Sequence, residues 1–283
     1  MLPLLQSILN KYSAGELLQM CKTINRDYNI YDPEDVRWAK LEYVLNKTTQ
    51  GEIELLRKSC LSNKVVNDMI FNYYFCERVI KYHFINHLRG RMDHIVAFEM
   101  SIGDSRIDIC RINGGSYAYE IKTEYDTFDR LGTQMQDYVR TFEKVYVIIP
   151  HNRIDDVMPL IPESCGIISY RITKDSIVIF SYRKQAQKNC CDIKFCLNSL
   201  SSSDMSYILR LLNETDSKTR EAKLAHLLQI ADTRSIWAQY RELLKHKYED
   251  QWGFVTQHFD QILPIDIQSF FSSKMNPSLL YTK

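Results

Sequence analysis

Hydrophobic and polar residues alternate through the middle of the chain, from His94 to Pro150, in the pattern of short β-strands. Apolar residues are concentrated over 107–112, alternate with polar ones over 117–121 and run unbroken over 145–149. A period of two predicts half-buried strands, and a short unbroken apolar run indicates a buried strand. Between the first two runs, residues 113–115 (Asn-Gly-Gly) accept the positive φ angles of a tight turn. The pattern predicts strand, strand, strand, helix, strand.

An amphipathic helix of about four turns is predicted between the third and fourth of these strands. Asp126, with Asp129 three residues later, is expected to cap its N-terminus. One face carries an apolar stripe formed by Leu131, Met135, Val139 and Phe142. A second stripe carries a cation, an amide and a phenol at intervals of four residues: Arg130, Gln134 and Tyr138. This second stripe is either an exposed polar edge or part of a site shared with the strands.

The chain before this segment has a helical pattern. Helix start signals occur at Ser13, Asp32 and Thr49, and one long helix is expected over 63–88. Glu77 on that helix could point toward a site on the sheet, but an isolated surface residue is the favoured interpretation. The N-terminal part is therefore predicted to be a small helical bundle.

After Pro150, a short helix near 154–160 and strands near 167–171 and 177–182 extend the predicted sheet. Residues 204–263 are helical again, and their aromatic side chains, among them Trp237, are typical of a bundle core. The predicted fold class is α/β, with a mixed β-sheet core of order αβββαβ flanked by N- and C-terminal helical regions. The predicted domains are a helical N-terminal region, a sheet domain and a helical C-terminal region, over residues 1–62, 63–185 and 200–283.

Composition places the chain among globular proteins. It has 283 residues, of which 45% are hydrophobic and 25% charged, enough to bury a full core. The formal net charge of +1 gives no strong overall field that would attract nucleic acid, so any basic binding surface must be a local patch.

The eight cysteines do not form the pattern of a disulfide framework, because a chain of this size needs no covalent cross-links and begins with no secretory signal. Cys190, Cys191 and Cys196 lack the further ligands that a zinc site requires. No apolar run approaches the length of a membrane span. We expect a protein of the reducing cytoplasm with no membrane partner.

The hairpin register brings two acids together. A three-residue loop at 113–115 pairs Cys110 with Ala118 and therefore Asp108 with Glu120. Directly opposed carboxylates destabilise a sheet, and a bound divalent cation would relieve their repulsion. Alternation places Lys122 on the same face as both acids. The competing interpretation is a solvated sheet face with an ordinary cluster of charges.

Asp108, then Glu120-Ile121-Lys122, then Gln134 and Tyr138 follow one another in an order that resembles the PD-(D/E)XK nuclease superfamily. In particular, the chain is similar to the RecB-like branch with its Gln-h-x-x-Tyr motif, over roughly residues 66–150. A set of mostly uncharacterised bacterial proteins in this superfamily shares a longer series of positions: Glu99, Arg106, Asp108, Glu120, Lys122, Asp126, Arg130, Leu131, Gln134 and Tyr138. No proline precedes Asp108, as the superfamily name would require; Arg106 and Ile107 stand there.

The resemblance implies a restriction-endonuclease-like fold and a divalent-metal-dependent phosphodiesterase that hydrolyses nucleic acid, DNA in preference to RNA. It assigns Mg²⁺ or Mn²⁺ to the oxygen ligands Asp108, Glu120 and the Ile121 carbonyl, with Glu99 as a further ligand. Lys122 would orient the attacking water and stabilise the transition state. Gln134 and Tyr138 would position Lys122 and the phosphate. Arg130 and Arg106 would contact the substrate. The resemblance also suggests defence against phage as the setting for such a nuclease.

Two other functions stay open. The fold could serve as a catalytically silent module that binds nucleic acid or a protein partner, or the acidic hairpin could decorate an unrelated α/β protein. Only the nuclease hypothesis requires Asp108, Glu120, Lys122 and Gln134 to converge. The helical ends would then select the substrate, a protein partner or a second copy of the chain.

Overall fold

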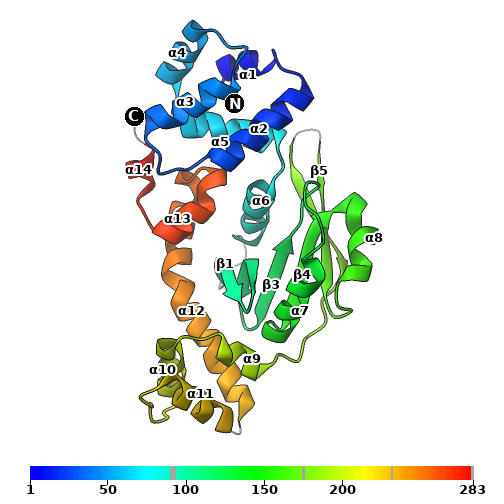
Figure 1. The fold of residues 1–283 in the computed structure, drawn as a ribbon, viewed down its shortest axis with the longest axis vertical. Helices are drawn as coiled ribbons and strands as arrows, with labels where there is room; N and C mark the ends of the chain where they lie inside the picture. The colour runs from blue at the N-terminus through cyan, green and yellow to red at the C-terminus, as the bar shows by residue number, and fades with distance from the viewer. Residues whose placement is uncertain (90–93, 174–175, 231, 282–283) are drawn as a thin grey trace. The chain divides into compact units, whose positions relative to one another are not determined.

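The computed structural model describes residues 1–89, 94–173, 176–230 and 232–281. The chain forms two compact units, drawn with their helices and strands in Figure 1. The helical unit consists mainly of Met1–His87 and Phe254–Lys283, and the sheet unit of Leu88–Thr173 and Ile177–Gly253. Each unit is described by itself.

A six-stranded mixed sheet forms the centre of the sheet unit, with the strands in sequence order from edge to edge. Its strands are β1 (Ile95–Ile102), β2 (Ser105–Ile112), β3 (Ser116–Ile121), β4 (Lys144–Pro150), β5 (Gly166–Ile172) and β6 (Val178–Lys184). The pairs β1–β2, β2–β3 and β5–β6 are antiparallel, whereas β3–β4 and β4–β5 are parallel. The predicted mixed α/β class and the αβββαβ order are confirmed.

The β2–β3 hairpin has the predicted register. Ile112 pairs with Ser116 and Cys110 with Ala118, and Gly114 takes a φ of +63° in the turn. Glycine adopts this left-handed conformation without the steric cost that a Cβ atom brings. The turn chemistry at 113–115 therefore sets which residues of the two strands face each other.

Parallel neighbours need crossover connections, and helices supply them here. Helix α7 (Leu131–Thr141) joins β3 to β4 and packs on β1, β2 and β4. Leu131 and Met135 of the predicted apolar stripe are buried together with Tyr138, whereas Val139 is half-buried. The short α8 (Ile154–Val157), between the 3₁₀ turns η1 (His151–Arg153) and η2 (Met158–Leu160), joins β4 to β5. Figure 1 shows α7 lying along the sheet.

The start of α7 differs from the prediction. The helix begins at Leu131 with Arg130 as its N-cap and spans 11 residues, close to three turns. Asp126 does not cap it, because its Oδ2 accepts hydrogen bonds from the Thr123 backbone N–H and the Thr123 hydroxyl, both at 2.7 Å. Asp126 thus closes the turn that follows β3.

Four helices complete the sheet unit: α9 (Ile193–Asn198), α10 (Ser202–Leu211), α11 (Arg220–Gln229) and the part of α12 (Thr233–His258) up to Gly253. The Ser-rich residues 199–203 lead into a helix, since Ser201 and Asp204 form a capping box at the start of α10. Tyr240 and Trp252 are buried as predicted for core aromatics, whereas Trp237 is half-buried.

Ten helical segments of the described residues, with residues 254–258 at the end of α12, make up the helical unit. They are α1 (Pro3–Leu9), α2 (Ala14–Asp27), α3 (Glu34–Val44), α4 (Gln50–Ser59), α5 (Ser62–Tyr73), α6 (Glu77–Arg89, of which Leu88 and Arg89 fall in the sheet unit), η3 (Phe259–Gln261), η4 (Pro264–Asp266), α13 (Ile267–Ser273) and α14 (Pro277–Leu280). Capping boxes at Ser13 and Thr49 confirm two of the predicted helix starts. The third start signal gives a helix at Glu34 whose N-cap, Pro33, supplies no side-chain hydrogen bond.

The single long helix expected over 63–88 is wrong. The chain forms two helices there, because Tyr74 leaves the helical conformation with φ −143° and ψ 92°. Three aromatic residues stand together at 73–75. Aromatic side chains lose rotamer freedom in a helix, so this is a weak point for helix propagation.

The compact units group the chain differently from the predicted ranges. The last helices belong with the N-terminal ones because Asp266, fully buried, accepts hydrogen bonds from the hydroxyls of Tyr28 (3.2 Å) and Tyr281 (2.9 Å). The Ile265 N–H also donates to the Asn67 side chain. Contacts between segments about 200 residues apart leave no trace in local sequence patterns.

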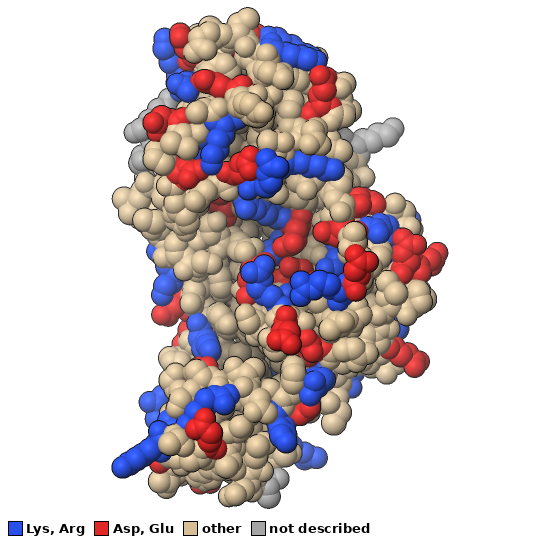
Figure 2. All heavy atoms as spheres, viewed as in Figure 1, with Lys and Arg blue, Asp and Glu red and all other residues tan. Residues whose placement is uncertain are grey.

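Surface charge matches the near-zero net charge, since Figure 2 shows cationic and anionic side chains interspersed over the face in view. All eight cysteines are free thiols. Within the described ranges, no helix combines the length and the apolar character needed to cross a membrane.

Candidate active site

The backbone ladder between β2 and β3 ends where the two acids face each other. Its last pair is Ile109 with Tyr119, so the same register places Asp108 opposite Glu120. The next N–H of β3, that of Ile121, donates to Asp108 Oδ2 at 2.6 Å. A side-chain carboxylate therefore takes the place that a β2 carbonyl would occupy in a continued ladder. The strands separate at this point.

The Ile121 carbonyl faces the same edge as its N–H. Within a β-strand the N–H and C=O of one residue point to the same side. The neighbouring N–H, that of Lys122, points the other way and donates to the Ile148 carbonyl of β4 at 2.9 Å. The Ile121 oxygen is thus directed toward the side of Asp108. Its predicted role as a metal ligand requires this direction.

Glu120, Lys122, Gln134 and Tyr138 form one hydrogen-bonded network. The Lys122 ammonium donates to Glu120 Oε1 at 2.8 Å and to Gln134 Oε1 at 3.2 Å. The Tyr138 hydroxyl lies 3.0 Å from Glu120 Oε2. Glu120 is only 2% exposed, and a buried carboxylate is tolerated when it is paired and hydrogen-bonded in this way. The structure therefore brings these four predicted site residues together.

Lys122 stays protonated at neutral pH. Burial alone would lower its pKa, but the charge and hydrogen bond of Glu120 outweigh burial and, with Asp108 and Asp126, raise the pKa above its usual value. Such a side chain is a cation and a proton donor, not a general base. It can neutralise charge on a phosphate and orient a water molecule.

Tyr138 stays a neutral phenol. Burial, with the charge of Glu120, raises the pKa of its hydroxyl. The hydroxyl oxygen lies 2.8 Å from the Arg106 carbonyl as well as 3.0 Å from Glu120 Oε2. Both are acceptors, so the single phenol proton serves one of them at a time. Tyr138 ties α7 to the strands and positions Glu120.

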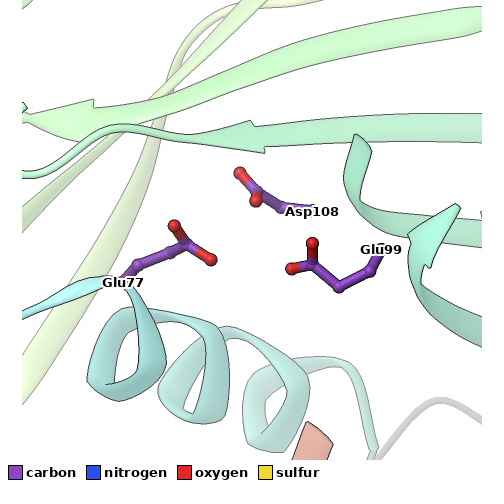
Figure 3. A group of neighbouring side chains, drawn as sticks. All are labelled: Glu77, Glu99 and Asp108. Atoms are coloured by element: carbon purple, nitrogen blue, oxygen red, sulfur yellow. The ribbon is translucent and has the colours of Figure 1, made fainter. Parts of the chain in front are cut away.

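Glu99 adds a second carboxylate beside Asp108. It lies in β1 between the pairs Phe98–Ile109 and Met100–Ile107, opposite Asp108, and it has a left-handed φ of +54°. Carboxylate oxygens of Glu99 and Asp108 lie within 4.8 Å of each other, and Figure 3 shows both side chains turned to one space. A left-handed, non-glycine residue inside a strand carries a strain of about 1–3 kcal/mol, and such strain is concentrated at functional sites.

Arg106 pairs with Glu99 at the rim of this cluster. Its Nε lies 2.7 Å from Glu99 Oε2, and its side chain is 69% exposed. An ion pair this exposed contributes little to stability, so the guanidinium is free to contact a substrate phosphate. Arg130, the other predicted substrate contact, is exposed, and its side chain has no hydrogen bond or ion pair with any residue that the structure describes. It does not join the network.

Figure 3 also labels Glu77, the first residue of α6. Within the helical unit its carboxylate accepts a hydrogen bond from Lys81 at 2.8 Å, and Lys81 also donates to Gln268 at 3.1 Å. Lys81 is only 1% exposed. Glu77 is therefore more than the isolated surface residue that we expected.

The donor types suit a hard divalent cation. Among the described residues, Glu99 and Asp108 belong to a group of carboxylates whose oxygens all lie within 4.8 Å of one another, and Glu120 does not belong to this group. Carboxylate oxygens from Glu99, Asp108 and Glu120 and the Ile121 carbonyl are the ligand types that Mg²⁺ and Mn²⁺ prefer. Each oxygen of Glu120 has a protein partner, yet a carboxylate oxygen has two lone-pair sites. Glu120 can thus bind a metal while it holds Lys122.

Arg153 stabilises the turn between β3 and α7, and no local sequence pattern predicts this role. Its Nη1 donates to the carbonyls of Thr123 (3.1 Å) and Asp126 (2.9 Å), and its guanidinium carbon lies 4.0 Å from the centre of the Phe128 ring. The parallel pairing of β3 and β4 brings the two C-terminal strand ends to one edge, where Arg153 follows β4. A prediction that β3 and β4 are parallel neighbours could therefore have identified Arg153 as a residue close to this turn.

Comparison with known proteins shows that the chain is similar to a family named after a phage protein. The sequence model of the family "Bacteriophage P4 protein cII" matches residues 71–270, a range that includes the whole network. Protein cII of Enterobacteria phage P4 is 26% identical over 72 residues, which are 25% of this chain and 27% of that protein. The aligned part thus spans about a quarter of this relative.

Among solved structures, the SPO1766 protein of unknown function from Silicibacter pomeroyi is similar to part of the fold. The superposition has a TM-score of 0.32 and 12% sequence identity, and it covers 47% of this chain and 88% of that one.

Proposed function

This chain belongs to the bacteriophage P4 protein cII family, and we propose that it is a divalent-metal-dependent nuclease that hydrolyses phosphodiester bonds, in DNA in preference to RNA. The observation that carries the proposal is the convergence of Asp108, Glu120, Lys122 and Gln134 at the point where β2 and β3 separate. A set of unrelated surface charges would not need a buried glutamate with two side-chain partners.

Hydrolysis of a phosphodiester needs a nucleophile at neutral pH and neutralisation of charge on the phosphate. Mg²⁺ or Mn²⁺, bound by Asp108, Glu120, the Ile121 carbonyl and Glu99, would supply both. The Lys122 ammonium, raised in pKa and held by Glu120 and Gln134, orients the attacking water and stabilises the negative charge that develops on the phosphate.

The remaining residues position these groups. Tyr138 holds Glu120 through its hydroxyl, and Gln134 holds the ammonium of Lys122 from α7. Arg106 and Arg130 are exposed cations that can contact the sugar-phosphate backbone. Backbone contacts of this kind fix the position of a strand without reading its sequence.

The free thiols support a place in the reducing cytoplasm, because a chain that depended on an oxidising compartment would have paired cysteines. The substrate would be nucleic acid, met in the same compartment. The helical unit is proposed to bind a protein partner or a second copy of the chain.

A cleavage assay tests the proposal. Linear and circular duplex DNA, single-stranded DNA and RNA are incubated with Mg²⁺, Mn²⁺ or EDTA. The wild-type protein should cut only with metal, and Asp108→Asn should abolish cutting. Asp104→Asn is the matched control, because Asp104 is an exposed acid in the turn between β1 and β2. If neither metal nor Asp108 matters, the nuclease assignment is wrong; metal-free binding without cutting would favour the silent binding module.

A further inference from the structure

A cavity of the sheet unit lies at the tip of the β2–β3 hairpin. It has a volume of about 650 Å³, and Gly114 of the turn is among its lining residues. Asp108 is six positions from Gly114, so about 20 Å of strand separates this cavity from the candidate active site. The size falls in the range of small-ligand pockets, roughly 300–1,000 Å³.

Cations dominate the lining. Lys188, Arg234 and Arg241 all border the cavity, with Glu143 as the acid among them. Glu143 pairs with Lys188 at 2.9 Å and with Arg241 at 3.7 Å, and it accepts a hydrogen bond from the Ser116 N–H at 2.9 Å. The lining residues carry three cations and one carboxylate, a sum of +2, and Asp232 adds a second carboxylate close to Arg234.

Arg234 provides the cation that is available to a ligand. It is exposed, and its guanidinium has no hydrogen bond or ion pair with another side chain of the described ranges. Arginine presents a planar fork of N–H donors that matches the oxygens of a phosphate. An anionic group in the cavity would therefore gain donors that currently have no protein partner.

Trp237 provides an aromatic surface beside these cations. Arg234, Trp237 and Arg241 follow one another at intervals of three and four residues, so they share one face of α12. Trp237 is half-buried and lines the cavity, whereas the neighbouring Tyr240, 5.5 Å away between ring centres, is buried in the core. A half-exposed indole next to an arginine is a surface on which a planar base can stack.

We propose that this cavity binds a nucleotide, with its phosphate against Arg234 and Lys188 and its base against Trp237. The nucleotide is either free or part of a single strand; in the second case it belongs to the substrate, and the inference rests on the proposed nuclease function. A strand held about 20 Å from the metal site would have a second anchor that sets how far from its end it is cut.

Binding measurements on the full chain in EDTA test the proposal without cleavage. The probes are deoxyadenosine 5′-monophosphate and inorganic phosphate, measured by calorimetry, and a fluorescein-labelled dodecathymidylate, measured by anisotropy. The variants are Arg234→Glu and Trp237→Leu, with Lys218→Glu as the matched control. Lys218 is an exposed lysine of the same unit that does not line the cavity.

We expect Arg234→Glu to weaken binding about tenfold or more and Lys218→Glu to change it less than about twofold, since only the first charge faces the ligand. Trp237→Leu should weaken binding of the two probes that carry a base and leave the binding of inorganic phosphate unchanged. Binding of the mononucleotide identifies a free ligand, and binding of the oligonucleotide alone identifies a strand.

Equal effects of Arg234→Glu and Lys218→Glu, or binding of phosphate as tight as that of the mononucleotide, would overturn the proposal. Because no metal is present, this outcome is independent of the cleavage assay. A protein that cuts DNA but fails this test refutes the cavity alone, and one that binds nucleotides but never cuts refutes the nuclease assignment alone.

Discussion

Replacement of Glu99 should make the protein more stable and less active. Glu99 has a φ of +54° within β1, and its carboxylate lies within 4.8 Å of that of Asp108. Two unit charges at this distance repel by about 3 kcal/mol at an effective dielectric constant of 20. The Arg106 pair offsets part of this repulsion, but an ion pair with so exposed an arginine contributes only about 0–1 kcal/mol.

Two substitutions separate charge from backbone strain. Glu99→Gln removes the charge and keeps the left-handed backbone, so we expect a gain of about 1–2 kcal/mol after screening. Glu99→Gly also removes the backbone strain of about 1–3 kcal/mol, whereas the greater chain entropy of unfolded glycine costs about 0.5–1 kcal/mol. The stability of Glu99→Gly should therefore exceed that of Glu99→Gln by about 0–2.5 kcal/mol.

Urea unfolding in EDTA, followed by circular dichroism, measures these differences. Saturating Mg²⁺ should reduce the difference in the free energy of unfolding between Glu99→Gln and the wild type, because the ion relieves the same repulsion. If Glu99→Gly is less stable than Glu99→Gln, the strained conformation of Glu99 is refuted. If both variants are less stable than the wild type without metal, the repulsion between the acids is refuted as well.

Three further predictions concern metal linkage, positioning and pH. Mg²⁺ at 100 times its Kd should stabilise the wild type by about 2.7 kcal/mol and raise its Tm, and Asp108→Asn should remove the shift; an equal shift in both proteins by calorimetry would place the ion elsewhere. Gln134→Ala and Tyr138→Phe should lower the cleavage rate less than Lys122→Ala does, because Gln134 and Tyr138 only position Lys122 and Glu120, which these variants retain. Single-turnover rates that fall as far as in Lys122→Ala would show that Gln134 or Tyr138 takes a direct part in the chemistry. Burial raises the pKa of Asp266 from 3.8 to about 6 although the hydroxyls of Tyr281 and Tyr28 bind it, so the folded state keeps this proton after the unfolded state has lost it. Stability should thus fall by about 3 kcal/mol as pH rises from about 4 to above 6. Asp266→Asn should remove this decline in urea unfolding at a series of pH values, and parallel curves for both proteins would contradict the shift.

The centre of the site could be predicted because it depends on residues that lie close together in the sequence. The turn at 113–115 fixed the hairpin register, and the register placed Asp108 opposite Glu120. The interval of four residues between Gln134 and Tyr138 placed both on one face of α7. Turn type and helical period depend on residues close in sequence, so a sequence pattern can carry them.

The features that the sequence did not predict depend on tertiary contacts or on competing local hydrogen bonds. Asp126 was expected to cap α7, but Thr123 offers it two donors in a tighter turn. The left-handed φ of Glu99 and the role of Arg153 depend on the strands that surround them. Residues with unfavourable local conformations are expected where function overrides local preference, which is why pattern reasoning misses them.

The most direct test of the nuclease proposal compares Lys122→Ala with the wild type for both cleavage and metal binding. Lys122 is not a metal ligand, so metal binding measured by calorimetry should survive in the variant, while single-turnover cleavage of DNA should fall about 100-fold or more, a loss of about 3 kcal/mol of transition-state stabilisation. Lys218→Ala, an exposed lysine outside the network, should cut at the wild-type rate. Equal cutting by Lys122→Ala and the wild type would show that the observed activity belongs to a contaminant or that the network of Glu120, Lys122 and Gln134 is not catalytic.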